Sequence, residues 1–148
     1  ISLGLVGSEM CIRDSAGTNL KKTIKSFLEN NGYVVKNTGE DKGESVDYPD
    51  YIHPLAKEIS EKKEEKGIII CGSGNGVSMV ANKYQGVRAA LCWNKEIASL
   101  SRQHNDANVL SLPARFLTSE EAIEIVKTFL DTDFEGGRHE RRVKKINK

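Results

Sequence analysis

The sequence is poor in the residues that form disulfides and bind metals. It contains three cysteines and three histidines among 148 residues. The cysteines are odd in number and have no paired spacing, which argues against a disulfide framework and indicates a reducing compartment: Cys11, Cys71 and Cys92. No C-x-x-C motif occurs, and the histidines are scattered without metal-ligand spacing: His53, His104 and His139. We therefore predict that the protein binds no metal.

An excess of charge of either sign is also absent. The 22 Lys and Arg residues almost balance the 21 Asp and Glu residues, so the formal net charge is +1. A chain so close to neutrality gives no reason to expect nucleic acid or a membrane surface as a partner. No apolar run is long enough to span a bilayer and no convincing signal peptide is present, so we expect a cytoplasmic protein.

Strand patterns alternate with helical patterns along the chain. Apolar segments typical of strands occur at residues 3–6, 33–36, 67–71, 87–92 and 108–112, with amphipathic segments between them. This alternation predicts an α/β fold, a three-layer α/β/α sandwich around a five-stranded, parallel, Rossmann-like sheet. Thr118 and Glu121 form a capping-box pattern. It opens a helix whose expected core face is Ala122, Ile123, Val126 and Leu130.

The most informative stretch is residues 67–79, where an apolar strand runs into a glycine-rich turn. Cys71 ends the strand, and ligands of open parallel sheets bind beyond the carboxyl ends of the strands. The backbone amides of the turn can stabilise a phosphate or a developing oxyanion: Gly72, Ser73, Gly74, Asn75 and Gly76. The start of the next helix also favours the thiolate form of Cys71. The stretch predicts an anion site with a reactive thiol.

Two other interpretations of this stretch stay open at this point. A free cysteine is often a buried packing residue, and Cys71 alone is compatible with that role. Glycine-rich turns also bind dinucleotides. Here, however, Gly72, Gly74 and Gly76 are spaced as G-x-G-x-G and not as G-x-G-x-x-G, and no P-loop motif occurs anywhere in the chain.

The two ends of the chain differ from the rest. Residues 1–15 are an atypical segment, because charged residues stand where a first central strand should be apolar. We expect this segment to be foreign to the domain or to replace its native first strand, and residues 16–148 to form a single domain. Near the other end, Arg138 and Arg142 lie one helical turn apart, a spacing that suits a phosphate. A solvated terminal helix is the alternative.

With these residues in view, the chain resembles the ribose-5-phosphate isomerase B family, which includes the galactose-6-phosphate isomerase subunits. The resemblance covers nearly everything from Ala16 onward. The matching stretches are residues 45–51, 67–82, 86–90, 101–110 and 135–139.

The resemblance implies an aldose–ketose isomerase of a phosphorylated sugar, without metal or organic cofactor. By matching position, Cys71 is the base that moves a proton between C1 and C2 through an enediolate. His104 matches the residue that opens the sugar ring, and Asn105 matches a substrate-binding amide. The arginines that match the phosphate ligands are Arg115, Arg138 and Arg142. The family builds each site from two subunits, so a homodimer, or a tetramer made from dimers, is expected.

The sequence departs from the family at one motif. Relatives have Asp-His-Ala-Gly where this chain has Asp14-Ser15-Ala16-Gly17. Asp14 and Ser15 match substrate-binding positions, but Ser15 cannot replace an imidazole. The leading hypothesis is isomerisation of ribose 5-phosphate to ribulose 5-phosphate. The alternatives are an isomerase of a six-carbon sugar phosphate, galactose 6-phosphate or allose 6-phosphate, and a sugar-phosphate binding module without catalysis.

Overall fold

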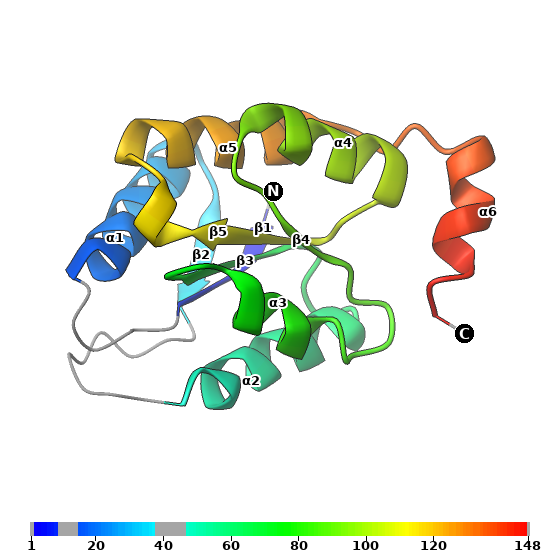
Figure 1. Ribbon diagram of the computed structural model, residues 1–148, viewed down its shortest axis with the longest axis horizontal. Coiled ribbons are helices and arrows are strands. Elements are labelled where there is room, and N and C mark those ends of the chain that lie inside the picture. The colour runs from blue at the N-terminus through cyan, green and yellow to red at the C-terminus, as the bar shows by residue number, and fades with distance from the viewer. Residues whose placement is uncertain (1, 9–14, 38–46, 148) are drawn as a thin grey trace.

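The computed structural model describes residues 2–8, 15–37 and 47–147, with side chains for residues 19–36 and 47–147 (Figure 1). Its elements are, in chain order, β1 (Ser2–Ser8), α1 (Ser15–Asn30), β2 (Val34–Asn37), α2 (Tyr48–Ser60), β3 (Gly67–Cys71), α3 (Asn75–Ala81), β4 (Ala89–Leu91), α4 (Lys95–Asn105), β5 (Val109–Pro113), the 3-10 turn η1 (Ala114–Phe116), α5 (Ser119–Asp131) and α6 (Arg138–Lys144). Among the helices in these ranges, none is both long and apolar enough to cross a membrane.

The five strands form one parallel sheet in the order β2-β1-β3-β5-β4. Helices α1, α4 and α5 cover one face, and α2 and α3 cover the other (Figure 1). The side chains of β3 alternate between these layers. Ile68 and Ile70 pack under α1, α4 and α5, whereas Ile69 packs under α2 and α3. The predicted three-layer α/β/α sandwich with a five-stranded parallel sheet is confirmed.

The first strand lies in the interior of the sheet. β1 pairs with β2 on one side and with β3 on the other, so residues 2–8 occupy the position of a first central strand. The predicted strand at residues 3–6 is confirmed and is longer than expected. Residues 9–14 lie outside the described part of the chain. The division into an atypical segment, residues 1–15, and a domain, residues 16–148, stays a prediction.

Side-chain hydrogen bonds to the backbone fix the starts of α4 and α5. Asn94 caps α4 by accepting a hydrogen bond from the Ile97 N–H at 2.9 Å. Thr118 and Glu121 form the predicted capping box of α5 with reciprocal hydrogen bonds of 3.2 and 3.0 Å. The core face of α5 differs in part from the prediction. The fully buried residues are Ala122, Ile125, Val126 and Phe129, while Ile123 and Leu130 are only partly buried at the edge of the stripe.

Candidate active site

The glycine turn after β3 is held tightly against the sheet. Gly74 has a φ of +75°, a left-handed conformation that favours glycine. A Cβ at Gly74 would overlap the end of the Leu91 side chain and lie 3.1 Å from Ser111 Oγ. The buried Ser111 hydroxyl donates a 2.9 Å hydrogen bond to the Gly74 carbonyl and anchors the turn to β5. The turn is therefore a rigid support at the carboxyl end of β3.

Polar side chains lie on both sides of this turn. A Cβ at Gly72 would lie 3.0 Å from Arg115 Nε, and the Arg115 N–H donates to the Gly72 carbonyl at 3.1 Å. A Cβ at Gly76 would lie 2.6 Å from the Tyr48 hydroxyl. The two glycines thus let Arg115 and Tyr48 approach the backbone closely. The resemblance gave Arg115 only as a phosphate ligand, and the structure places it beside this turn. Tyr48 was not predicted at the site, because nothing in the local sequence links the start of α2 to the start of α3.

The backbone N–H groups at the start of α3 are partly hydrogen-bonded within the turn. Ser73 Oγ accepts a 3.3 Å hydrogen bond from the Asn75 N–H. The side chains of Ser73 and Asn75 are exposed. The helix begins at Asn75, inside the turn. An anion at the turn would therefore meet exposed polar groups with the helix dipole behind them.

The two described cysteines have different environments. Cys71 is partly exposed at the end of β3, where it pairs in register with Pro113. Cys92 is fully buried, and burial raises the pKa of its thiol to about 11. Cys71 also packs against the core cluster under α2 and α3, so it combines a packing contact with partial exposure, whereas Cys92 is a packing residue alone. Cys11 lies outside the described residues.

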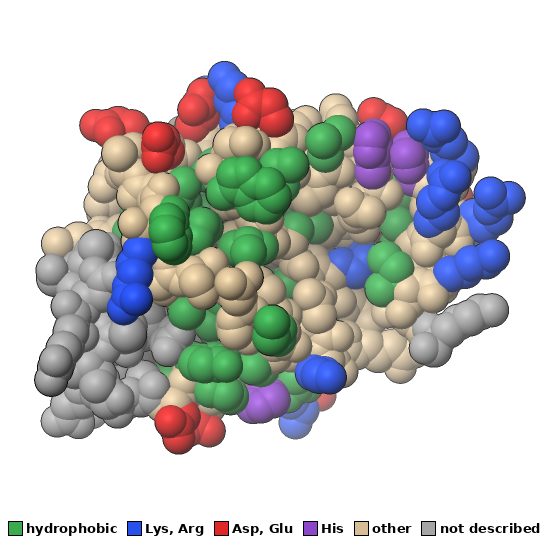
Figure 2. Space-filling model, in the orientation of Figure 1, with side chains coloured by type: hydrophobic (Ala, Val, Ile, Leu, Met, Phe, Trp, Pro, Cys, Tyr) green, Lys and Arg blue, Asp and Glu red, His purple; other side chains and the backbone are tan. Residues whose placement is uncertain are grey.

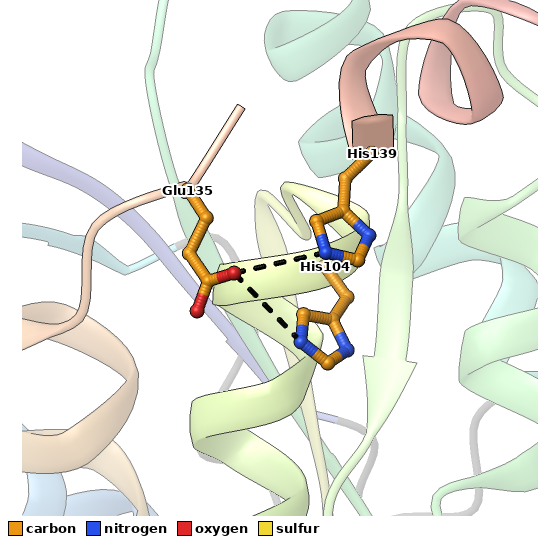
Figure 3. A group of neighbouring side chains, drawn as sticks. All are labelled: His104, Glu135 and His139. Atoms are coloured by element: carbon orange, nitrogen blue, oxygen red, sulfur yellow. Dashed lines mark ion pairs between the residues drawn. The ribbon is translucent and has the colours of Figure 1, made fainter. Parts of the chain in front are cut away.

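A second polar group gathers at the end of α4. The imidazoles of His104 and His139 are stacked, with ring centroids 4.3 Å apart and planes 11° from parallel (Figure 3). Glu135 Oε2 lies 3.6 Å from His139 Nε2 and 4.0 Å from His104 Nε2. The description of these histidines as scattered is wrong in three dimensions, because the chain folds back and brings His139 onto His104. The ligand atoms of these three side chains lie within 4.8 Å of one another, a grouping that could hold a metal ion.

The environment of His139 favours the neutral form of its ring. Only 12% of the His139 side chain is exposed, and its pKa is lowered, first by removal from water and then by the nearby charges of His104 and Arg138. Arg142 also lowers this pKa. Arg138 and Arg142 therefore lie close to the stacked histidines, and Figure 2 shows Lys and Arg side chains beside them.

Helix α6 carries these arginines without contributing to the core. None of its residues is buried, and both Arg138 and Arg142 are exposed. The exposure of α6 is what the solvated-helix alternative predicts. The helix still has a tertiary contact, because His139 stacks on His104 of α4. Asn105, the last residue of α4, is also exposed in this group.

The two polar groups lie at opposite edges of the sheet, one at the edge formed by the carboxyl ends of the strands and the other at the edge formed by their amino ends. We name them the thiol group (Tyr48, Cys71, the 72–76 turn and Arg115) and the histidine group (His104, Asn105, Glu135, Arg138, His139 and Arg142). Cys71 is the last residue of β3. His104 lies shortly before Val109, the first residue of β5, and Val109 pairs with Gly67, the first residue of β3. Four residues of strand, at about 3.3 Å each, separate these edges by about 13 Å. One chain does not bring Cys71 and His104 together.

Asp14 and Ser15 are not placed at either group. Asp14 lies outside the described residues, and of Ser15 only the backbone is described, as the first residue of α1.

The α/β sandwich places a partly exposed thiol and Arg115 beside the glycine turn, and the chain matches known proteins of one enzyme family. The profile of the family described as Ribose/Galactose Isomerase matches residues 10–146. The chain is 42% identical over 134 residues to D-erythrulose-4-phosphate isomerase of Pectobacterium atrosepticum, covering 90% of this chain and 88% of that protein.

Solved structures match over almost the whole chain. Ribose 5-phosphate isomerase of Thermotoga maritima superposes with a TM-score of 0.91 at 43% identity, covering 99% of this chain and 97% of that one. Ribose-5-phosphate isomerase B of Mycoplasma genitalium with bound ribulose-5-phosphate gives a TM-score of 0.90 at 41% identity, covering 98% and 93%. The chain belongs to the ribose/galactose isomerase family, so it is a sugar isomerase, as the resemblance implied.

Proposed function

We propose that this enzyme interconverts ribose 5-phosphate and ribulose 5-phosphate. The observation that carries the proposal is the partly exposed Cys71 at the carboxyl end of β3, beside a rigid glycine turn and Arg115. The relative of known structure from M. genitalium binds ribulose-5-phosphate, which supports a five-carbon substrate.

In the proposed mechanism, the Cys71 thiolate removes the proton from C2 of the open-chain aldose. The electron pair moves to the carbonyl oxygen, and the turn at Gly72–Gly76 stabilises the resulting enediolate. The O2 hydroxyl then passes its proton to O1, and Cys71 delivers the proton that it took to C1 as the carbonyl forms at C2, which gives the ketose. Beforehand, His104 protonates the ring oxygen as its bond to C1 breaks, and the C1 hydroxyl gives its proton to water, which leaves the open-chain aldose; donating a proton is a task that suits an imidazole.

We propose that each active site is shared between two copies of the chain. The thiol group and the histidine group each hold part of the machinery, and they lie at opposite edges of one sheet. A two-fold dimer can place the histidine group of one protomer over the thiol group of its partner. Arg138, Arg142 and Asn105 would then bind the end of the sugar phosphate that lies away from Cys71.

An apolar surface supports this assembly. The exposed large hydrophobic residues include Met79 on α3, Trp93 after β4 and Leu100 on α4. Figure 2 shows hydrophobic side chains gathered on the face that carries α3, β4 and α4. A dimer formed through this face would bury them. We further propose a cytoplasmic location, which fits the absence of a bilayer-spanning helix among the described residues.

The test is ribulose 5-phosphate formation by the chain as given, by Cys71→Ala and by Ser15→His. Loss of the catalytic base should lower kcat by at least about 100-fold. Ser15→His restores the imidazole of the family motif and should raise kcat/KM. Equal turnover by the chain as given and by Cys71→Ala would refute the proposed role of the thiol.

A panel of other sugars separates the alternatives. The P. atrosepticum relative is named for a four-carbon sugar phosphate, so erythrulose 4-phosphate belongs in the panel with galactose 6-phosphate and allose 6-phosphate. A higher kcat/KM with any of them would reassign the substrate while keeping the chemistry. Sugar-phosphate binding by calorimetry with no turnover of any of them, even in Ser15→His, would identify a binding module.

A further inference from the structure

The histidine group contains two side chains beside His104, Glu135 and His139, to which the proposed isomerase chemistry assigns no role. His104 comes from the last turn of α4, Glu135 from the segment before α6, and His139 from the first turn of α6. Their side chains converge, as Figure 3 shows, with the Glu135 carboxylate facing both rings. Two imidazoles and one carboxylate are a donor set typical of zinc and other transition metals.

The backbone holds the three donors in place. The Glu135 N–H donates a 3.1 Å hydrogen bond to the Gln103 carbonyl, which fixes the segment against α4. Gly136 and Gly137 then turn the chain with φ values of +68° and +55°. The His139 N–H donates to the Gly136 carbonyl at 3.0 Å and starts α6 over His104. The cluster is therefore built by main-chain contacts and is not a chance meeting of mobile side chains.

From this geometry we propose that His104, Glu135 and His139 bind a transition-metal ion such as Zn²⁺, and that the ion inhibits the enzyme. Bonds of about 2.0–2.1 Å to a tetrahedral ion set neighbouring ligand atoms about 3.3 Å apart. Glu135 Oε2 already lies 3.6 Å from His139 Nε2 and 4.0 Å from His104 Nε2. Binding thus needs shifts of an ångström or so, with water as a fourth ligand.

One rearrangement is required. Because the imidazole planes are only 11° from parallel, a single ion cannot lie in both planes. The His104 ring must rotate about its Cβ–Cγ bond and give up the stack. Its side chain is 39% exposed, which leaves room for this rotation, whereas His139 is only 12% exposed and stays in place.

The surrounding charge selects the kind of ion. Arg138 directly precedes His139, and Arg142 lies one helical turn after Arg138 on α6, so their guanidinium charges repel a cation near His139. Mg²⁺ and Ca²⁺ prefer oxygen ligands and gain little from imidazole, so they should not overcome this repulsion. Zn²⁺, Ni²⁺ and Cu²⁺ form strong bonds to imidazole nitrogen and should overcome the repulsion. Binding itself depends only on this geometry; the inhibition rests on the proposed ring-opening role of His104.

The test uses the full chain, titrated with ZnCl₂ and separately with MgCl₂ by calorimetry, and assayed for isomerase turnover with and without each salt. Glu135→Gln and His139→Gln each remove one ligand. The matched control is His53→Gln, because His53 lies on α2 and bonds to Tyr84, outside the cluster. The inhibition is expressed as a ratio within each variant, so a change in basal activity does not affect it.

We expect one Zn²⁺ per chain, no binding of Mg²⁺, and at least about tenfold weaker Zn²⁺ binding in both ligand variants but not in the control. Inhibition by Zn²⁺ should weaken in parallel and be reversed by EDTA. Bound Co²⁺ should show visible d–d bands without the near-ultraviolet band of a thiolate ligand. A thiolate band, or unchanged Zn²⁺ affinity in both ligand variants, would overturn the site. Zn²⁺ binding without isomerase turnover, both in the chain as given and in Ser15→His, would leave the site standing and refute the proposed function.

Discussion

The separation of the thiol and histidine groups predicts that two inactive variants can restore each other. Cys71→Ala removes the proposed base at the carboxyl edge of the sheet, and His104→Gln removes the proposed acid at the amino edge, with the length of β3, about 13 Å, between the two edges. If a site combines the edges of two protomers, a dimer with one chain of each kind contains one intact site and one site that lacks both groups.

The expected recovery follows from counting subunits. Each variant alone should retain about 1% of the parent activity or less, because a positioned acid or base contributes about 100-fold or more. Equal amounts of the two chains, after random exchange, form about 50% mixed dimers, each with one working site of two, so the mixture should regain about 25% of the parent activity.

The assay is ribulose 5-phosphate formation after co-refolding from urea, with native mass spectrometry to count the mixed dimers. Both variants are made in the chain as given and in Ser15→His. The matched control mixes Cys71→Ala with Arg115→Ala. Arg115 lies against Gly72 in the same thiol group, so this pair cannot restore a site. No recovery by the first pair, although mixed dimers are present, would refute the shared site.

Three further predictions concern stability. Gly74→Ala should lower the free energy of unfolding by about 2–4 kcal/mol in urea titrations. Gly32→Ala is the control and should cost about 1 kcal/mol, because Gly32 has a similar positive φ but open space around it. Thr118→Ala should lose about 1 kcal/mol through the capping box, whereas Thr23→Ala inside α1 should not, as thermal melts would show. The pKa of Cys92 is raised to about 11, so the unfolded chain releases this proton first and stability should fall above about pH 9. Cys92→Ala should remove this part of the alkaline loss in urea titrations.

Local patterns were enough to predict most of the fold. The alternation of apolar and amphipathic segments predicted the parallel sandwich, and the Thr118–Glu121 pattern predicted the start of α5. The errors were local as well. Ile125 and Phe129 are more buried than Ile123 and Leu130, because the angle at which α5 packs selects one side of a broad apolar stripe, and that angle depends on neighbouring helices.

The candidate site could be predicted only in part. Cys71 at a strand end and the glycine turn are features of consecutive residues, so the sequence revealed them. The contact of Tyr48 with Gly76 and the stack of His139 on His104 join residues that are far apart in the chain. No local spacing signals such contacts.

The sequence by itself determined the alternation of strands and helices, the helix caps and the place of the thiol at the end of β3. These features depend on side-chain periodicity and backbone hydrogen bonding within a few residues. Only the tertiary structure decided that Cys71 and His104 occupy opposite edges of the sheet and that His104, Glu135 and His139 converge. Those arrangements follow from the course of the whole chain, because each parallel crossover returns it to the amino edge before the next strand begins.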